Sequence, residues 1–188
     1  HTKNHFVKLS VFFPLMFLVA FFNIKFWHNF SYIIFLLVIL LLIWVSFFGI
    51  KSSGSQRWMD LYLFVLQPSE LMKVAVIMCL AKYYHRLKIE NVNSFTSILI
   101  ALLIISIPII FVISQPDLGT SILIASSGLI ILWLGGVKVK YFIYSFFTFL
   151  ISLPFIISFL KPYQKLRILT FLDPDRDPLG AGYQIIQS

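Results

Sequence analysis

The composition of this 188-residue chain excludes an ordinary soluble domain, because 60% of its residues are hydrophobic and only 12% are charged, against roughly a quarter charged in soluble proteins. Its net charge is +8, but its cations do not gather in one stripe between aromatic side chains, which argues against nucleic-acid binding. The single cysteine, Cys79, excludes a disulfide framework, and the histidines lack metal-ligand spacing. No glycine-rich nucleotide-binding loop is present.

Six apolar runs follow one another along the chain, at about residues 6–24, 31–50, 68–84, 97–114, 119–136 and 141–160. Each is close to the ~20 residues that a helix needs to cross a bilayer. Because lipid tolerates no unpaired backbone group, these runs should be helices rather than strands. The sequence therefore predicts an all-α, polytopic integral membrane protein with about six transmembrane helices. We expect one membrane domain over residues 1–188, whose last part, 161–188, is polar.

The connections between these runs fall on two faces that carry different charges. Lys and Arg occur on both faces, so the positive-inside rule does not decide the orientation. Of the seven carboxylates, only Glu90 belongs to the first face, and all others belong to the second. Short basic connections such as Lys82–Lys88 favour the first face as the cytoplasmic one. The surplus of cations indicates either attraction to anionic lipid headgroups, at ~1 kcal/mol per cation, or an anionic substrate on the acid-rich face.

A first polar motif opens the third apolar run. Pro68 suits the first position of a helix, where its missing N–H is harmless. Glu70 then falls in the first turn, where the helix dipole favours an anion. Helix capping alone could account for both residues. Lys73, however, lies three residues further along the same face, inside the span, and an intramembrane ionisable residue suggests function. We therefore favour Glu70–Lys73 as a functional pair.

Two further motifs have both a structural and a functional interpretation. Pro116 is predicted to open the fifth helix, with Asp117 in its first turn, where we favour a supporting role for this carboxylate. Trp58 could belong to the interfacial aromatic belt. Since Trp58 follows Arg57 in a loop rich in Gly and Ser, the two could instead form a platform for a sugar or a lipid headgroup.

The terminal segment carries three alternating carboxylates, Asp173, Asp175 and Asp177, with Arg176 among them. Asp-Pro pairs commonly open turns, which accounts for two of the three acids. A carboxylate at a membrane interface could also act as a general base on a hydroxyl group. Nearby cations could stabilise charge on a phosphate leaving group. The spacing does not choose among the three carboxylates.

Four motifs occur in order along the chain: Gly54-Ser-Gln-Arg-Trp58, Gln67-Pro-Ser-Glu-Leu-Met-Lys73, Gln115-Pro-Asp-Leu-Gly-Thr120 and Asp173-Pro-Asp-Arg-Asp-Pro-Leu-Gly-Ala-Gly-Tyr-Gln-Ile-Ile-Gln-Ser188. Together they resemble the shape, elongation, division and sporulation (SEDS) family, whose members include RodA and FtsW. The resemblance covers essentially the whole chain. The last motif is more similar to RodA, although Gln184 stands where RodA relatives commonly carry His.

The resemblance implies a ten-helix, multi-pass protein of the bacterial inner membrane that polymerises lipid II into peptidoglycan glycan strands. Its active face would be extracytoplasmic, and its expected partners are lipid II, a class B penicillin-binding protein transpeptidase and membrane lipids. Compared with that architecture, the chain would be a fragment that lacks the first helix and the last three. Residues 161–188 would start the large extracytoplasmic loop. Such a fragment alone should be inactive.

Carried over by motif, the resemblance implies that Asp177 is the catalytic base on the acceptor sugar's 4-hydroxyl, with undecaprenyl diphosphate leaving. It also implies that Trp58 is functionally important and that Glu70 and Lys73 line the family's central cavity. Charge and position, rather than the family, suggest Arg57 and Arg176 for diphosphate contact. No cofactor is certain, although a divalent cation, Mg²⁺ or Mn²⁺, could help neutralise the diphosphate.

Three other interpretations stay open at this stage. The chain could belong to a flippase or transporter that moves the same lipid, because an intramembrane Glu70–Lys73 pair would suit a transport path. It could also belong to an FtsW-like division polymerase rather than to one serving elongation and cell shape. A scaffold for a cell-wall complex is compatible with either. Catalysis would require Asp177 as a base, whereas translocation should tolerate Asn there.

Overall fold

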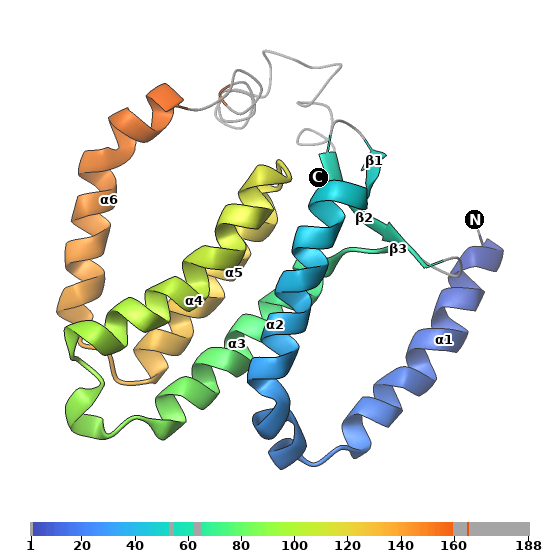
Figure 1. Ribbon diagram of the computed structural model, residues 1–188, viewed down its shortest axis with the longest axis horizontal. Coiled ribbons are helices and arrows are strands. Elements are labelled where there is room, and N and C mark those ends of the chain that lie inside the picture. The colour runs from blue at the N-terminus through green and yellow to red at the C-terminus, as the bar shows by residue number, and fades with distance from the viewer. Residues whose placement is uncertain (1, 53–54, 62–64, 160–164, 166–188) are drawn as a thin grey trace. The chain divides into compact units, whose positions relative to one another are not determined.

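The computed structural model describes residues 2–52, 55–61, 65–159 and 165 and shows a mostly helical chain (Figure 1). Within these ranges the long helices are α1 (Thr2–Phe21), α2 (Ile24–Phe48), α3 (Pro68–Arg86), α4 (Phe95–Ser114), α5 (Leu118–Leu134) and α6 (Val139–Phe159). The shorter elements are the strands β1 (Ile50–Ser52), β2 (Ser55–Asp60) and β3 (Val65–Leu66) and the 3₁₀ turn η1 (Ile89–Asn91). The chain divides into two compact units, and α6 belongs to the second, Val139–Ser188.

Each apolar run of the sequence lies on one of these helices. However, α2 begins about seven residues before its run, and α4 begins about two residues before its run. The reason is helix capping by polar side chains that hydropathy leaves out. The Oδ1 atom of Asn23 accepts a hydrogen bond from the backbone N–H of Lys25 at 3.0 Å. At the start of α4, the hydroxyl of Ser94 accepts one from the backbone N–H of Ser97 at 3.2 Å. Each cap satisfies a backbone donor that the first helical turn leaves unpaired.

The predicted number of membrane spans is not established by these helices. Among the described residues, α2 and α4 are long and apolar enough to cross a bilayer, with mean hydropathies of 2.8 and 2.9. The α3 helix carries Glu70, Lys73 and Lys82, which lower its hydropathy, and α5 has 17 residues. The count of about six spans therefore stays a prediction.

The all-α expectation is wrong for the connection between α2 and α3, which forms a small antiparallel sheet in the order β1-β2-β3. Ile50 pairs with Trp58, and Met59 pairs with Leu66. Backbone groups outside a helix still need hydrogen-bond partners, and these short strands supply them to one another. The side-chain amide of Gln56 also donates to the carbonyl of Phe47 at 3.2 Å, which ties β2 to the end of α2.

Four helices of the first unit share a core in which α3 packs against α2, α4 and α5. The side chains of Leu42, Met72, Val76 and Ile124 are fully buried there. The outward faces of the same helices are also apolar, with Leu36, Leu37, Leu40, Leu102, Leu103 and Ile122 exposed. An apolar exterior of this kind is expected of helices that face lipid rather than water.

The α2–α3 pair is joined by polar contacts at the end where α2 begins and α3 finishes. The ammonium group of Lys82, on a residue only 4% exposed, donates to the carbonyl of Asn29 at 2.6 Å and lies 4.7 Å from the Tyr32 ring centroid. Buried charges need such partners. The opposite end of the pair, where α2 finishes and α3 begins, carries the polar motifs of the sequence.

Candidate functional site

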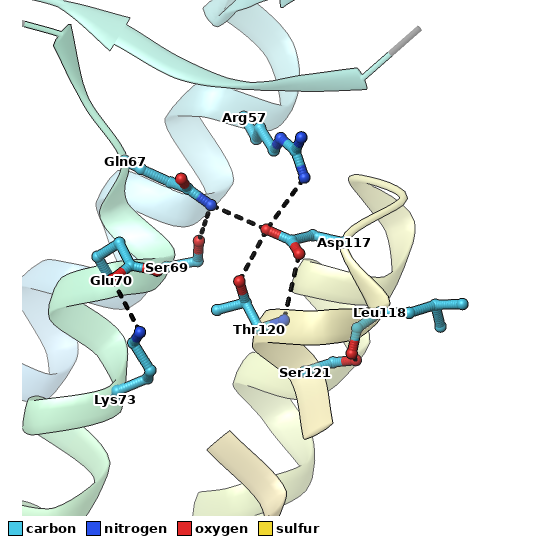
Figure 2. Close-up of polar contacts among 9 residues, drawn as sticks. All are labelled: Arg57, Gln67, Ser69, Glu70, Lys73, Asp117, Leu118, Thr120 and Ser121. Carbon is cyan, nitrogen blue, oxygen red and sulfur yellow. Dashed lines mark hydrogen bonds and ion pairs between the residues drawn. The ribbon is translucent and has the colours of Figure 1, made fainter. Parts of the chain in front are cut away.

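The centre of the polar site is Asp117, a buried carboxylate at the start of α5 (Figure 2). Its Oδ1 atom accepts a hydrogen bond from the backbone N–H of Thr120 at 3.2 Å, and its Oδ2 atom accepts one from the Thr120 hydroxyl at 2.9 Å. Oδ2 also accepts the side-chain amide of Gln67 at 2.8 Å and lies 3.3 Å from Nη1 of Arg57. Asp117 therefore joins three segments: α5, the start of α3 and strand β2.

Asp117 does not occupy the first turn of α5, as the sequence suggested, and Pro116 is not the first residue of that helix. The helix begins at Leu118, and Asp117 is its N-cap. An N-cap carboxylate can accept the backbone N–H three residues ahead and lies at the positive end of the helix dipole. The contact with the Thr120 N–H shows this geometry. This contact fits the structural interpretation of Asp117 as a helix cap, and its supporting role in function stays a prediction.

Arg57 reaches this carboxylate from β2 and keeps hydrogen-bonding capacity for another group. One of its terminal nitrogens faces Asp117, and its Nε atom is buried without a hydrogen-bond partner among the residues that the structure describes. A buried donor that stays unsatisfied costs about 1–3 kcal/mol, whereas the side chain as a whole is 28% exposed, so part of it is open to another group. A guanidinium group offers donors in the planar arrangement that matches phosphate and carboxylate oxygens.

Glu70 and Lys73 form the ion pair that their spacing predicted, with Nζ of Lys73 2.8 Å from Oε2 of Glu70. Pro68 is the first residue of α3 and Glu70 lies in its first turn, also as predicted. The two side chains are 55% exposed for Glu70 and 27% exposed for Lys73. An exposed pair three residues apart contributes only ~0.2–0.5 kcal/mol to a helix. The contribution of this pair to helix stability is therefore too small to explain its presence.

Sequence reasoning assigned no role to two glutamines that the structure places at the centre of the contacts. The side-chain amide of Gln67 donates both to Asp117 and, at 2.9 Å, to the hydroxyl of Ser69. Gln115, which is 4% exposed, donates to the carbonyl of Leu42 at 3.1 Å and to the hydroxyl of Ser46 at 2.9 Å. Their position in the sequence could have pointed to them, because each glutamine precedes a proline beside a helix terminus.

Trp58 lies outside this polar network. It is partly exposed, and the pairing of β1 with β2 steps from Ile50–Trp58 to Lys51–Gln56, which makes Arg57 the extra residue of a bulge where regular strand alternation does not apply. The shared platform of Arg57 and Trp58 therefore stays a prediction. Asp177 and Arg176 lie outside the described residues, so their assignments stay predictions.

The described part of the site offers few side chains that could act as metal ligands. No group of three or more His, Cys, Asp and Glu side chains gathers there in a way that could hold a metal ion. Asp117 uses its oxygens for Thr120, Gln67 and Arg57, which leaves it poorly suited to act as a metal ligand.

This chain is similar to a known family, to named proteins and to solved structures. The family of FtsW/RodA/SpoVE cell cycle proteins matches it over residues 2–188. It is 41% identical over 167 residues to the peptidoglycan glycosyltransferase MrdB of Escherichia coli K12, covering 86% of this chain and 43% of that protein. It is 36% identical over 194 residues to the probable peptidoglycan glycosyltransferase FtsW of Buchnera aphidicola (Schizaphis graminum), covering 100% of this chain and 54% of that protein. The chain thus spans about half the length of these curated relatives.

Two solved structures share the fold. One belongs to a study of the structural coordination of polymerization and crosslinking by a peptidoglycan synthase complex. It aligns with a TM-score of 0.85 and 28% identity, over 98% of this chain and 55% of that one. The other is the rod shape determining protein RodA of Thermus thermophilus, with a TM-score of 0.68 and 22% identity, over 79% of this chain and 49% of that one. With its sequence matched from residue 2 to residue 188, the chain belongs to the FtsW/RodA/SpoVE family, the SEDS family that its motifs resemble.

Proposed function

We propose that the protein to which this chain belongs is a peptidoglycan glycosyltransferase that polymerises lipid II into glycan strands. The observation that carries the proposal is the 41% identity, over most of this chain, to a protein named peptidoglycan glycosyltransferase. The site supports it, because Arg57 is fixed by a buried carboxylate and keeps donors that suit a diphosphate. The substrate would be lipid II, and the leaving group would be undecaprenyl diphosphate.

The proposed reaction is a single displacement with inversion. Asp177 accepts the proton of the acceptor sugar's 4-hydroxyl. The oxygen forms a bond to the anomeric carbon of the donor glycan while the bond from that carbon to the diphosphate oxygen breaks. The electron pair leaves with undecaprenyl diphosphate, and Arg57 and Arg176 stabilise its charge. A divalent cation, if one takes part, would arrive with the diphosphate, and no step depends on it.

The cellular setting forms part of the same proposal. We place the protein in the bacterial inner membrane as a multi-pass protein, in one membrane domain with about six spans in this chain. The site and residues 161–188 would lie on the extracytoplasmic face. The similarity to MrdB and the last motif favour a role in elongation, and the similarity to FtsW keeps a division polymerase as the alternative. A class B penicillin-binding protein is the proposed partner, supported by the likeness to a synthase complex that coordinates polymerization with crosslinking.

Transport of lipid II is the second candidate function, favoured by one observation. Glu70 and Lys73 form an ion pair within a helix that is otherwise largely apolar, which suits a polar path through a membrane. The two functions differ in their demand on Asp177, since only catalysis requires a base there.

The test uses the full-length protein, reconstituted with its partner transpeptidase and supplied with fluorescent lipid II. Three proteins are compared: the native one, Asp177→Asn, and Asp175→Asn as a matched loss of a carboxylate in the same segment. The proposal expects polymer from the native protein and from Asp175→Asn, and none from a normally inserted Asp177→Asn. Polymer at the native rate from Asp177→Asn would overturn its assignment as base. Lipid II that crosses the vesicle membrane without polymer from the native protein would support the transporter instead.

A further inference from the structure

Gln67 occupies the N-cap position of α3 but does not cap that helix. No side-chain hydrogen bond from Gln67 satisfies the first turn of α3. Its amide nitrogen instead donates to Oδ2 of Asp117 at 2.8 Å and to the hydroxyl of Ser69 at 2.9 Å. A Ser, Thr, Asp or Asn at the same position would cap the helix better. The side chain therefore serves the contact between α3 and α5 rather than its own helix.

The contact determines where the Asp117 carboxylate lies. Oδ2 receives Gln67 from one side, the Thr120 hydroxyl from its own helix and Arg57 from β2. Thr120 can fix the carboxylate only relative to α5, because both residues belong to the same helix terminus. Gln67 adds the contact that fixes it relative to α3. Arg57 is thereby linked to the start of α3 through Asp117 and Gln67, and no contact joins Arg57 and Gln67 directly in Figure 2.

We infer that Gln67 is a positioning residue of the proposed glycosyltransferase: it orients the Asp117 carboxylate, which in turn orients the Arg57 guanidinium toward the lipid diphosphate. This inference rests on the proposed function. Gln67 touches neither the reacting sugar nor the leaving group in this scheme. Its removal should therefore weaken the binding of lipid II, and raise KM, more than it lowers kcat.

The variant Gln67→Glu tests this arrangement by replacing an amide donor with a carboxylate of nearly the same shape. At about pH 8 the new carboxylate is ionised and cannot donate to Oδ2 of Asp117; Arg57, 3.3 Å from that oxygen, offsets only part of the repulsion, so Asp117 is displaced. At about pH 5.5 the pair can share one proton, which restores a donor to Oδ2 of Asp117. The quantity to compare is the KM ratio, which is the KM of the variant for lipid II divided by that of the native enzyme at the same pH. We expect this ratio to be roughly tenfold or more at the higher pH and to return toward one at the lower pH.

Asn91→Asp is the matched control, because it makes the same change from amide to carboxylate on an exposed side chain of η1, outside this network. Its KM ratio should be close to one and should not depend on pH. A merely structural loss in Gln67→Glu would lower activity without this recovery. The inference would be overturned if the KM ratio of Gln67→Glu did not change with pH, or if both variants changed the KM ratio equally.

A second variant keeps the test decisive if Gln67→Glu does not insert normally. Gln67→Met has a similar length but no donor, so its KM should be raised at every pH without recovery. A native KM for Gln67→Met would overturn the inference. Failure of the proposed function is a separate outcome, because the native protein would then make no polymer at any pH.

Discussion

Arg57 and Asp117 approach to 3.3 Å although they lie on different segments, one on a strand that follows α2 and the other at the start of α5. The carboxylate is 9% exposed and the guanidinium side chain 28% exposed, so the contact is largely shielded from water. Burial costs both charges part of their hydration, so removal of one partner leaves the other charge without compensation. The pair therefore fixes the sheet segment against the helices where the polar motifs meet.

Asp117→Asn should impair both stability and activity, because it removes the ion pair and places an amide donor where Oδ2 accepts three contacts. We expect a loss of about 1–3 kcal/mol in the free energy of unfolding and a roughly tenfold or greater rise in the KM for lipid II. Thermal unfolding and glycan-strand synthesis measure the two effects. Glu90→Gln, a matched loss of a carboxylate on η1, should change neither. Native stability and KM in Asp117→Asn would show that the network is dispensable.

Lys73→Met should lower activity without much effect on stability. The Glu70–Lys73 pair is partly exposed and contributes only ~0.2–0.5 kcal/mol as a helix pair, so the melting temperature should hardly change. Because we propose that the pair serves the reaction, we expect the rate of polymerisation to fall by about tenfold or more. The charge-reversed double variant Glu70→Lys/Lys73→Glu restores a pair but not the position of each charge. Full activity in either protein would assign the pair to structure alone.

Gly128→Ala should destabilise the packing of α4 against α5. A Cβ atom at Gly128 would lie 2.7 Å from side-chain atoms of Ile105, so the two helices or that side chain must shift. Overpacking of this kind costs about 1–3 kcal/mol. Gly119→Ala is the matched control in the same helix, because its Cβ would meet nothing within 4 Å. Thermal unfolding should therefore show a lower melting temperature for Gly128→Ala only, and equal melting temperatures would contradict this packing.

Local patterns in the sequence predicted the features that depend on neighbouring residues. Each apolar run lies on a helix, because hydropathy and the absence of turn residues act within one segment. Pro68 at the start of α3 and the Glu70–Lys73 pair were likewise predictable, since a helix sets the spacing of residues three apart. The predicted start of α5 at Pro116 was wrong by two residues, because acidic residues are common both at the N-cap and in the first turn of a helix.

The rest of the site depends on contacts between distant segments. Nothing in the local sequence of Gln67 shows that its amide will meet Asp117, because the meeting depends on how α3 packs against α5. The sheet was missed for a similar reason: strands of two to six residues give almost no alternation to read. Asp177, the predicted base, lies outside the described residues, and its role stays with the resemblance and the proposed experiment.

The most direct test of the account is the affinity for undecaprenyl diphosphate, the proposed leaving group, measured for the full-length native protein and for Arg57→Gln. Lys25→Gln is the control, because it removes one positive charge from the other end of α2. Loss of a charged contact with a phosphate should weaken binding by roughly tenfold or more, whereas Lys25→Gln should bind as the native protein does. Equal affinities of the native protein and Arg57→Gln would contradict the claim that Arg57, held by Asp117, contacts the diphosphate.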